Sequence, residues 1–222
     1  MNNSVSTTAR LLWAGLRALL VLTLVTGVVY PLAVTGVAQT LFHGKANGSE
    51  ITSDGKVVGS SLIGQPYNLP LKKGQETPDP DLQWFQGRPA NGLGANSVNT
   101  QYKLILSGAT NLSADNKDLI QQVKDAKAAV VKDNSVSGYT VKPQDVPADA
   151  VTSSGSGLDP NISPAYADLQ VHRVAAKNGL TVAQVQKLVD EHTDGRTLGF
   201  IGEPRVNVLE LNIALKDLVA KK

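Results

Sequence analysis

The sequence contains no cysteine among its 222 residues. This absence excludes disulfide scaffolds, thiolate metal sites, cysteine nucleophiles and a lipoprotein-type anchor. The chain also lacks a G-x-S-x-G nucleophile elbow, an H-E-x-x-H zinc motif and an EF-hand loop. Aromatic residues make up only 5% of the chain, and its three histidines lie far apart. The sequence therefore predicts no catalytic residue and no metal site.

The charge is nearly balanced, with 21 Lys and Arg against 19 Asp and Glu. Arg10 and Arg17 are the only charged side chains before residue 43, so residues 43–222 carry equal numbers of basic and acidic residues. A balanced domain offers no electrostatic footprint for nucleic acid, and we expect no nucleic-acid partner. The length and the 41% apolar content predict one folded domain plus an additional segment.

That additional segment is an uncharged, mainly apolar run at residues 18–42. As a helix it would be about 37 Å long, which exceeds the roughly 30 Å hydrocarbon core of a bilayer and the length of a signal-peptide core. The run favours a retained transmembrane helix over residues 12–41. Arginines without acidic residues before it favour a cytoplasmic tail, residues 1–11, and an extracytoplasmic domain, residues 42–222.

Small or weakly polar residues recur every four positions along this helix, at Thr23, Gly27, Pro31 and Thr35. They form a slowly drifting stripe on one face, where small side chains allow another membrane helix to approach closely. Pro31 should kink the helix and expose carbonyl groups. The alternative is that Gly and Pro are simply common in membrane helices.

The first half of the domain reads as a hairpin followed by irregular chain. Asp54 and Gly55 separate two short strand-like segments and predict a tight β-turn. Residues 64–100 show no sustained hydrophobic period. A long irregular stretch of this kind favours an interface with a partner. Ser113 should cap a helix that includes Ile120 and Val130, and residues 135–150 should form a linker.

The last third of the sequence carries clear helix signals. Ser163, Pro164 and Gly179 predict a helix over residues 164–178. Thr181 and Gln184 form a capping box for a second helix with a buried face that includes Val182. A short strand is expected within residues 198–206, and Asn207 with Glu210 should cap a last helix. Together these signals indicate an α+β domain with a small antiparallel sheet and several helices.

Two other functions are compatible with these features. An anchored extracytoplasmic hydrolase would need Ser154 and His172 to meet with a carboxylate, although an isolated helix histidine is usually structural. A periplasmic binding protein released by cleavage near Ala38 would need the apolar run to act as a signal peptide. The glycine-rich residues 152–157 lack the Gly-Lys-Ser/Thr ending of a phosphate loop and indicate a flexible turn.

Several blocks of sequence, in this order, resemble the C subunit of the Kdp potassium-transporting P-type ATPase. The blocks are residues 27–31 (GVVYP), 46–49 (ANGS), 59–65 (GSSLIGQ), 85–89 (FQGRP), 154–164 (SGSGLDPNISP) and 202–212 (GEPRVNVLELN). The resemblance extends over about residues 20–218. Residues 107–111 (SGATN) depart from the SGGSN expected of the family, and residues 68–81 form a longer stretch than usual.

The resemblance implies a non-catalytic accessory subunit in the inner membrane of a bacterium. Its partners would be a channel-like potassium-binding subunit, a P-type ATPase subunit and the lipid bilayer, with ATP and potassium handled by the partner subunits. The family has been described as a catalytic chaperone that raises the ATP affinity of the ATPase subunit, and alternatively as a cap near the outer entrance of the channel-like subunit. The motif positions it marks for an interface or for architecture are Gly87, Arg88, Pro89, Gly157, Leu158, Asp159, Asn161, Ser163, Pro164, Asn207, Glu210 and Asn212.

Overall fold

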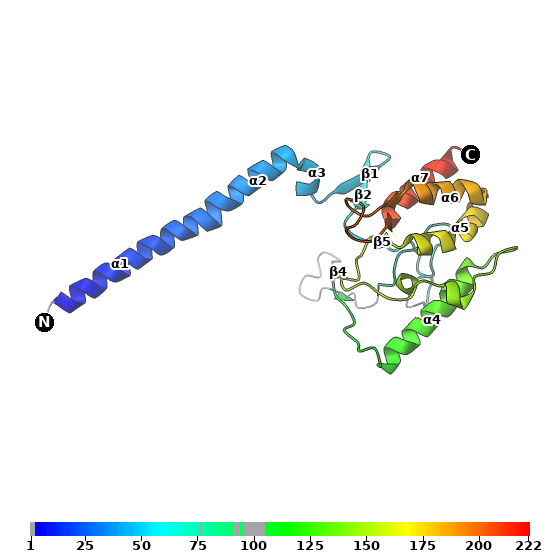
Figure 1. Cartoon of the computed structure of the whole chain (residues 1–222), viewed down its shortest axis with the longest axis horizontal. Helices are drawn as coiled ribbons and strands as arrows, with labels where there is room; N and C mark the ends of the chain where they lie inside the picture. The colour runs from blue at the N-terminus through cyan, green and yellow to red at the C-terminus, as the bar shows by residue number, and fades with distance from the viewer. Residues whose placement is uncertain (1–2, 76, 91–93, 96–104) are drawn as a thin grey trace. The chain divides into compact units, whose positions relative to one another are not determined.

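A computed structural model describes every residue except 1–2, 76, 91–93 and 96–104. The chain divides into two compact units, Met1–Glu50 and Ile51–Lys222. The first unit is mainly helical, and the second combines helices with short antiparallel strands (Figure 1). The α+β class expected from the sequence is confirmed.

The first unit is dominated by one long apolar helix. α1 (Asn3–Leu24), a π-helical segment (Val25–Val29) and α2 (Tyr30–Leu41) follow one another directly, and a short α3 (His43–Ala46) comes after them. Within the described part of the chain, this is the one helix that is long and apolar enough to cross a membrane, over Ser6–Leu41. The expected span, residues 12–41, lies inside it, and residues 3–11 continue the helix toward the N-terminus.

The helix changes its hydrogen-bonding pattern immediately before Pro31. The amide of Tyr30 donates to the carbonyl of Val25, five residues back, and Pro31 has no N–H with which to continue the pattern. A π segment of one turn is a known source of helix irregularity. The irregularity expected at Pro31 is therefore located on its N-terminal side, at Val25–Val29.

The second unit begins at a hairpin formed by β1 (Glu50–Ser53) and β2 (Lys56–Ser60). The turn residues Asp54 and Gly55 have φ angles of 51° and 72°. Positive φ at both central residues is the requirement of a type I′ turn, which Asp-Gly satisfies well. The predicted hairpin is confirmed.

Helix α4 (Lys117–Asn134) begins later than the sequence suggested. The Asn116 side chain accepts hydrogen bonds from the amides of Asp118 and Leu119 at 2.8 and 3.1 Å. Ser113, predicted as the cap, instead donates to the Asp115 carboxylate at 2.6 Å. Asn and Ser are equally good N-caps, so the sequence allowed both positions and the prediction was wrong by three residues.

Burial along α4 is uneven. Ile120 in its first half is 40% exposed, although it was expected on the buried face, whereas Val130 near its end is buried. α4 packs against α5 (Pro164–Asn178), and Asn134 at the end of α4 accepts a hydrogen bond from Arg173 of α5. Ile120 therefore leaves apolar surface of the first half in contact with solvent, whereas Val123 in the same half packs partly against the core.

Residues 135–150 are packed against the core and do not form the expected linker. They include two short 3₁₀ turns, Pro143–Asp145 and Ala148–Ala150. Val141 and Ala150 are each only 3% exposed. These buried positions could not be recognised in the sequence. They are isolated among prolines and polar residues, and they do not recur at the two-residue period of a strand or the 3.6-residue period of a helix.

The last three helices begin and end close to the predicted positions. They are α5 (Pro164–Asn178), α6 (Val182–Glu191) and α7 (Val208–Ala220). Ser163 caps α5, Gly179 ends it in the left-handed conformation, and the capping box of Thr181 and Gln184 is complete. The Asn207 side chain accepts from the amides of Leu209 and Glu210 at 3.1 and 3.2 Å. Local capping chemistry thus sets these boundaries.

The strands of the second unit are very short. β5 (Asn161–Ile162), β7 (Arg205–Asn207) and β6 (Thr193–Asp194) form an antiparallel sheet in that order, and β3 (Gly94–Ala95) pairs with β4 (Ile105–Leu106). Of the strand expected within residues 198–206, only the last residues form one, in β7. Leu198 and Phe200 are instead exposed in a turn closed by a bridge between Thr197 and Ile201.

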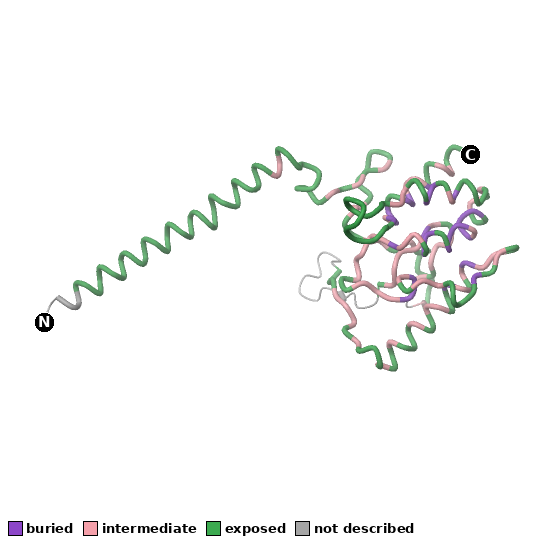
Figure 2. The backbone as a smooth tube through the Cα atoms, in the orientation of Figure 1, coloured by how far each residue is buried: buried purple, intermediate pink, exposed green. Residues whose placement is uncertain are grey.

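The core lies among α5, α6, α7 and the sheet, where the buried residues gather in Figure 2. Val174 of α5, Val185 of α6 and Leu211 of α7 are fully buried. Val182, expected on the buried face of α6, is 40% exposed at its first turn. The face predicted for α6 is otherwise correct.

Two side-chain amides fix the irregular stretch to this core. The Asn212 side chain accepts from the amide of Phe85 and donates to its carbonyl, both at 2.9 Å. Gln170 does the same for Gln86, at 2.7 and 3.1 Å. Both amide side chains are buried, and they replace the hydrogen bonds that a neighbouring strand would provide. An irregular segment can therefore pass beside the core without unsatisfied backbone groups.

Arg173 of α5 is completely buried and holds the same stretch. Its guanidinium donates to the Asn134 side chain at 2.8 Å, to the Gln170 side chain at 2.7 Å and to the carbonyls of Leu82 and Trp84. Burial lowers the pKa of Arg173 to about 10, so the group stays charged at neutral pH. One cation thus ties α4, α5 and the irregular stretch together.

Candidate functional site

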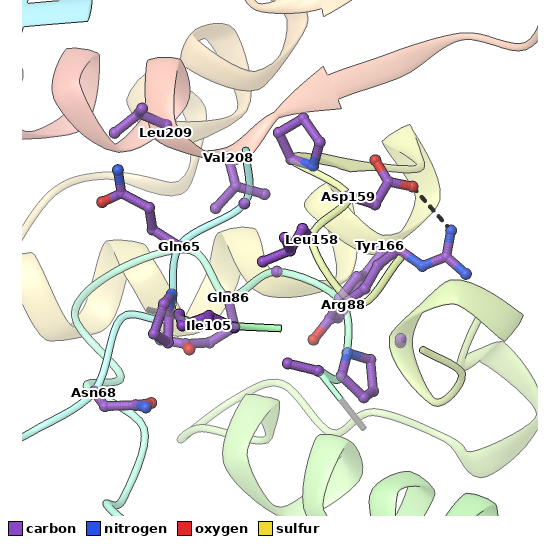
Figure 3. Close-up of a pocket in the computed structure, with 18 residues that line it drawn as sticks. Gln65, Asn68, Gln86, Arg88, Ile105, Leu158, Asp159, Tyr166, Val208 and Leu209 are labelled. Carbon is purple, nitrogen blue, oxygen red and sulfur yellow. Dashed lines mark hydrogen bonds and ion pairs between the residues drawn. The ribbon is translucent and has the colours of Figure 1, made fainter. Parts of the chain in front are cut away.

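A cavity of about 340 Å³ opens on the second unit, where several separate segments meet (Figure 3). Its lining comes from the stretch after β2, from residues 86–90, from the loop before β5 and from the first turns of α5 and α7. Small-ligand pockets have volumes of about 300–1,000 Å³, and their walls are usually mainly apolar with a few polar groups. We take this cavity as the candidate site.

Half of the motif positions marked from the sequence line this cavity. They are Gly87, Arg88, Pro89, Gly157, Leu158 and Asp159. The two blocks that supply them are about 70 residues apart in the sequence and meet only through folding. The fold therefore brings the FQGRP and GLDP motifs to one place.

An ion pair joins these two blocks. Arg88 Nη1 lies 3.1 Å from Asp159 Oδ2, at one side of the cavity in Figure 3. The other guanidinium nitrogens of Arg88 donate to the carbonyls of Thr152 and Ser153 at 3.4 and 3.3 Å. All three nitrogens of Arg88 are thus engaged within the protein, and the cavity is electrically balanced on this side.

The loop between the cavity and α5 is fixed by two carboxylates. Asp159 accepts from the amide of Asn161 at 3.0 Å, and Asp149 accepts from the amide and hydroxyl of Ser163 at 2.7 and 2.9 Å. Ser163 also caps α5, where Pro164 is the first residue. Asn161, Ser163 and Pro164 therefore position the cavity wall through backbone geometry.

Tyr166 lies in the first turns of α5 and lines the cavity, although it is only 4% exposed. Its hydroxyl makes no hydrogen bond with any residue that the structure describes. In the described residues no fully buried side-chain oxygen or nitrogen lacks a partner, so this hydroxyl retains contact with open space. Burial raises the pKa of Tyr166 to about 12. The hydroxyl is therefore a protonated donor at neutral pH.

Gly64 sits where two walls of the cavity touch. Its amide donates to the carbonyl of Leu158 at 2.8 Å, and a Cβ atom on Gly64 would lie 2.6 Å from the carbonyl oxygen of Asp159. Backbone atoms cannot yield to such a contact without moving the chain. Close approach at this point therefore requires glycine.

We expect Gly64→Ala to lower the free energy of unfolding by about 1–3 kcal/mol, because the new methyl forces the two segments apart. Denaturant unfolding of the purified chain measures this change. Gly155→Ala is the matched control, since a Cβ there meets no atom within 4 Å. Equal stabilities for the two variants would contradict the close-packing argument.

The remaining motif positions lie outside this cavity. Asn207 and Glu210 border a second, more polar cavity of about 390 Å³, where the Asn207 side chain donates to the carbonyl of Ser61 at 2.8 Å. Asn212 is in the core. Thr23, Gly27, Pro31 and Thr35 belong to the long helix of the first unit.

The residues considered for a hydrolase have other partners. The hydroxyl of Ser154 lies 3.3 Å from that of Ser156 and 3.4 Å from the amide of Asp159. The His172 ring stacks on Tyr139 with 3.7 Å between centroids. Among the described residues no hydrogen bond links Ser154 to His172, and no group of three His, Asp or Glu gathers as in a metal site.

Tyr166, Gln170 and Arg173 were missed by sequence reasoning. All three follow the Ser163-Pro164 helix start and share its buried side. A polar residue at a helix position can equally face solvent, and only the neighbours brought by folding show otherwise. A signal existed in the spacing, since Tyr166, Gln170 and Arg173 recur every three or four residues.

Comparison with known proteins gives one consistent family. Residues 12–217 match the family described as K+-transporting ATPase, c chain. The potassium-transporting ATPase KdpC subunit of Streptomyces avermitilis is 84% identical over 220 residues, 99% of each chain. The subunit of the same name from Streptomyces coelicolor is 79% identical over 99% of this chain and 98% of its own. That of Mycobacterium tuberculosis is 42% identical over 94% and 99%. Because the match covers nearly the whole chain, the protein belongs to the family of C subunits of the potassium-transporting ATPase.

Proposed function

We propose that this chain is a non-catalytic accessory subunit of a high-affinity, ATP-driven potassium uptake complex. The family match over residues 12–217 carries the proposal. Its partners are a channel-like potassium-binding subunit and a P-type ATPase subunit, and its role is to assemble with them or stabilise them. The single long apolar helix fits a single-pass membrane subunit.

Co-purification tests this role. A tagged version of the full chain, extracted from its own membrane, should bring two larger membrane subunits with it in fixed proportion. Deleting the chain should abolish growth at low potassium and leave growth at high potassium unchanged. A chain recovered alone, together with normal growth of the deletion strain, would contradict the proposal.

The proposed topology places residues 1–11 in the cytoplasm and residues 42–222 outside the bacterial inner membrane. Arg10 in the tail and Arg17 near the N-terminal end of the span, with no acidic residue before residue 43, support this orientation through the positive-inside rule. Protease added to intact spheroplasts should then degrade residues 42–222. Protection in spheroplasts and digestion in inverted vesicles would reverse the topology.

We propose further that ATP and potassium are handled by the partner subunits. Arg88, which borders the main cavity, already pairs with Asp159 and donates to the carbonyls of Thr152 and Ser153, so a triphosphate would have to compete with these partners. A domain outside the membrane is also separated from cytoplasmic ATP. If this subunit raises the ATP affinity of the ATPase subunit, it acts through a coupling free energy between distant sites.

The small residues of the long helix give a test of assembly. Gly27→Leu should disturb assembly of the complex more than Leu24→Val, because bulk at a position of close approach separates the helix backbones. Nothing lies within 4 Å of a Cβ placed on Gly27, so the helix itself tolerates the change. The yield of complex per membrane mass is the measurement, and equal yields would contradict this role of Gly27.

A further inference from the structure

The turn between β6 and β7 presents large apolar side chains to solvent. Leu198 is 79% exposed, Phe200 74% and Ile201 51%. The amide of Thr197 donates to the carbonyl of Ile201, and the amide of Ile201 donates back, both at 2.9 Å. We call residues 197–201 the apolar tip. Neighbouring exposed apolar side chains of this kind mark a contact with a protein or a membrane.

Leu198 stands in this tip at a conformational cost. Its φ angle is 55°, in the left-handed region where a side chain crowds the following carbonyl and where Gly or Asn is favoured. The side chain is mostly exposed, so packing within the second unit does not offset this cost. Strain of this kind points to a function outside the fold itself.

The base of the apolar tip lies beside the point where the chain enters the second unit. The tight turn at Asp54 and Gly55 folds β2 back along β1, so the residues after β2 return to the start of β1. Ser61, which follows β2, borders the second cavity together with Asp194 and Arg205, which flank the tip. Figure 1 accordingly shows the chain between α6 and β7 next to the β1–β2 hairpin.

The long helix limits how far this entry point can be from a bilayer, whatever the arrangement of the two units. Residues 42–49 separate the end of α2 from the start of β1. Extended chain spans at most about 3.3–3.6 Å per residue, so this connection reaches no more than about 30 Å. A segment tethered so closely meets the membrane at a high effective concentration, and even a weak contact is populated.

The charges at the base of the apolar tip are paired. Arg196 Nη2 lies 3.0 Å from Glu203 Oε2, and Arg205 Nη2 lies 3.4 Å from Asp194 Oδ2. Insertion of the tip therefore brings no unpaired charge toward the apolar phase and requires no anionic lipid. A protein partner would need a pocket that matches the protruding side chains, whereas lipid adapts to them. These features favour the bilayer as the partner.

We propose that Leu198, Phe200 and Ile201 insert at the boundary between lipid headgroups and acyl chains, as a second membrane contact of this subunit besides its long helix. The proposal rests on the proposed function, because it takes the long helix as a membrane anchor. It holds for either orientation of that anchor. The contact gives the second unit a defined face toward the membrane.

Quenching by lipid tests this contact in the full chain, reconstituted in nanodiscs. The chain has no cysteine, so Phe200→Cys provides a single thiol for a small fluorophore. Interfacial segments lie about 5–10 Å deep, so a nitroxide high on the acyl chain should quench this probe about threefold or more over the control site. That site is Ile120→Cys, 40% exposed on α4, which lies away from the β1–β2 hairpin in Figure 1. Neutral phosphatidylcholine and high salt should give the same result.

Leu198→Asn separates the membrane contact from folding. Asn adopts positive φ more readily than Leu, so the melting temperature should rise or stay within about 2 °C of the wild type. Loss of one inserted side chain should lower the quenching at position 200 by about half or more. Leu71→Asn is the matched control, because Leu71 is 57% exposed outside the tip, and it should leave the quenching unchanged. Unchanged quenching in Leu198→Asn would contradict the insertion of Leu198.

A probe in the span distinguishes failure of this proposal from failure of the proposed function. Leu24→Cys should be quenched by a nitroxide deep in the acyl chain, and a probe there without quenching refutes the membrane anchor itself. Quenching at Leu24 without quenching at Phe200 refutes the tip alone. Quenching at Phe200 that needs anionic lipid or disappears at high salt overturns the apolar insertion. Loss of that quenching in the intact complex would show that a partner subunit covers the tip, and would overturn the proposal for the transporter.

Discussion

Replacing Arg173 by alanine is expected to lower the free energy of unfolding by about 3–5 kcal/mol. The substitution removes the donor of the Leu82 carbonyl and of the Asn134 side chain, and it opens a cavity. The Trp84 carbonyl and the Gln170 side chain lose one of two donors and keep Gln86. For a chain of this size the melting temperature should fall by about 10 °C. Thermal unfolding followed by circular dichroism measures the change.

Arg196→Ala is the control for this prediction. Arg196 forms an ion pair with Glu203 at 3.0 Å on the surface, where its side chain is 48% exposed. Exposed pairs contribute roughly 0–1 kcal/mol, so this variant should unfold close to the wild type. Similar melting temperatures for the two arginine variants would show that Arg173 does not organise the core.

Asn212→Ala is expected to be the second most damaging change, with a loss of about 2–4 kcal/mol. Among the described residues, the Asn212 side chain is the hydrogen-bond partner of both the amide and the carbonyl of Phe85, which is completely buried. Each backbone group left unsatisfied costs about 1–3 kcal/mol. Hydrogen exchange of the Phe85 amide should accelerate together with the loss of stability.

Asn178→Ala provides the comparison. Its side chain donates to the carbonyls of Gln83 and Val174 at 2.8 and 2.9 Å, and the bond to Gln83 is exposed. Water can replace the amide there, so the loss should stay below about 1 kcal/mol. If Asn178→Ala costs as much as Asn212→Ala, burial is not the source of the effect.

The elements predicted best are those whose ends are determined by capping residues close in the sequence. Ser163 with Pro164, the pair Thr181 and Gln184, and Asn207 each supply side-chain acceptors to the first amides of a helix, and short-range geometry is enough to identify them. The Asp54-Gly55 hairpin belongs to the same class. The start of α4 was misplaced because two adequate caps stand three residues apart.

The packing of the irregular segments could not be predicted. Phe85 is completely buried, yet it lies in a stretch without periodicity, and its position depends on Asn212, 127 residues away. Residues 135–150 are also held by isolated buried side chains, such as Val141, which packs in the core. Hydrophobic periodicity reports regular elements only, so buried residues in irregular chain leave no pattern.

The candidate site was predicted in part. Gly87, Arg88 and Asp159 were marked because they stand in motifs, and folding brings them to one cavity. These residues were identified through the family resemblance, which does not explain why they lie close together in the fold. The ion pair between Arg88 and Asp159 and the buried position of Tyr166 beside the cavity could be found only in the structure, because each depends on segments far apart in the chain.

The π segment before Pro31 also affects on which side of the long helix the small residues lie. An α-helix turns by about 100° per residue, so three steps of four residues, from Thr23 to Thr35, would carry the set about 120° around the axis. The π turn holds one additional residue and takes back about 100° of that rotation. The four small residues then lie in a nearly straight row along the helix. A neighbouring helix could pack along this row parallel to the axis, without supercoiling around it.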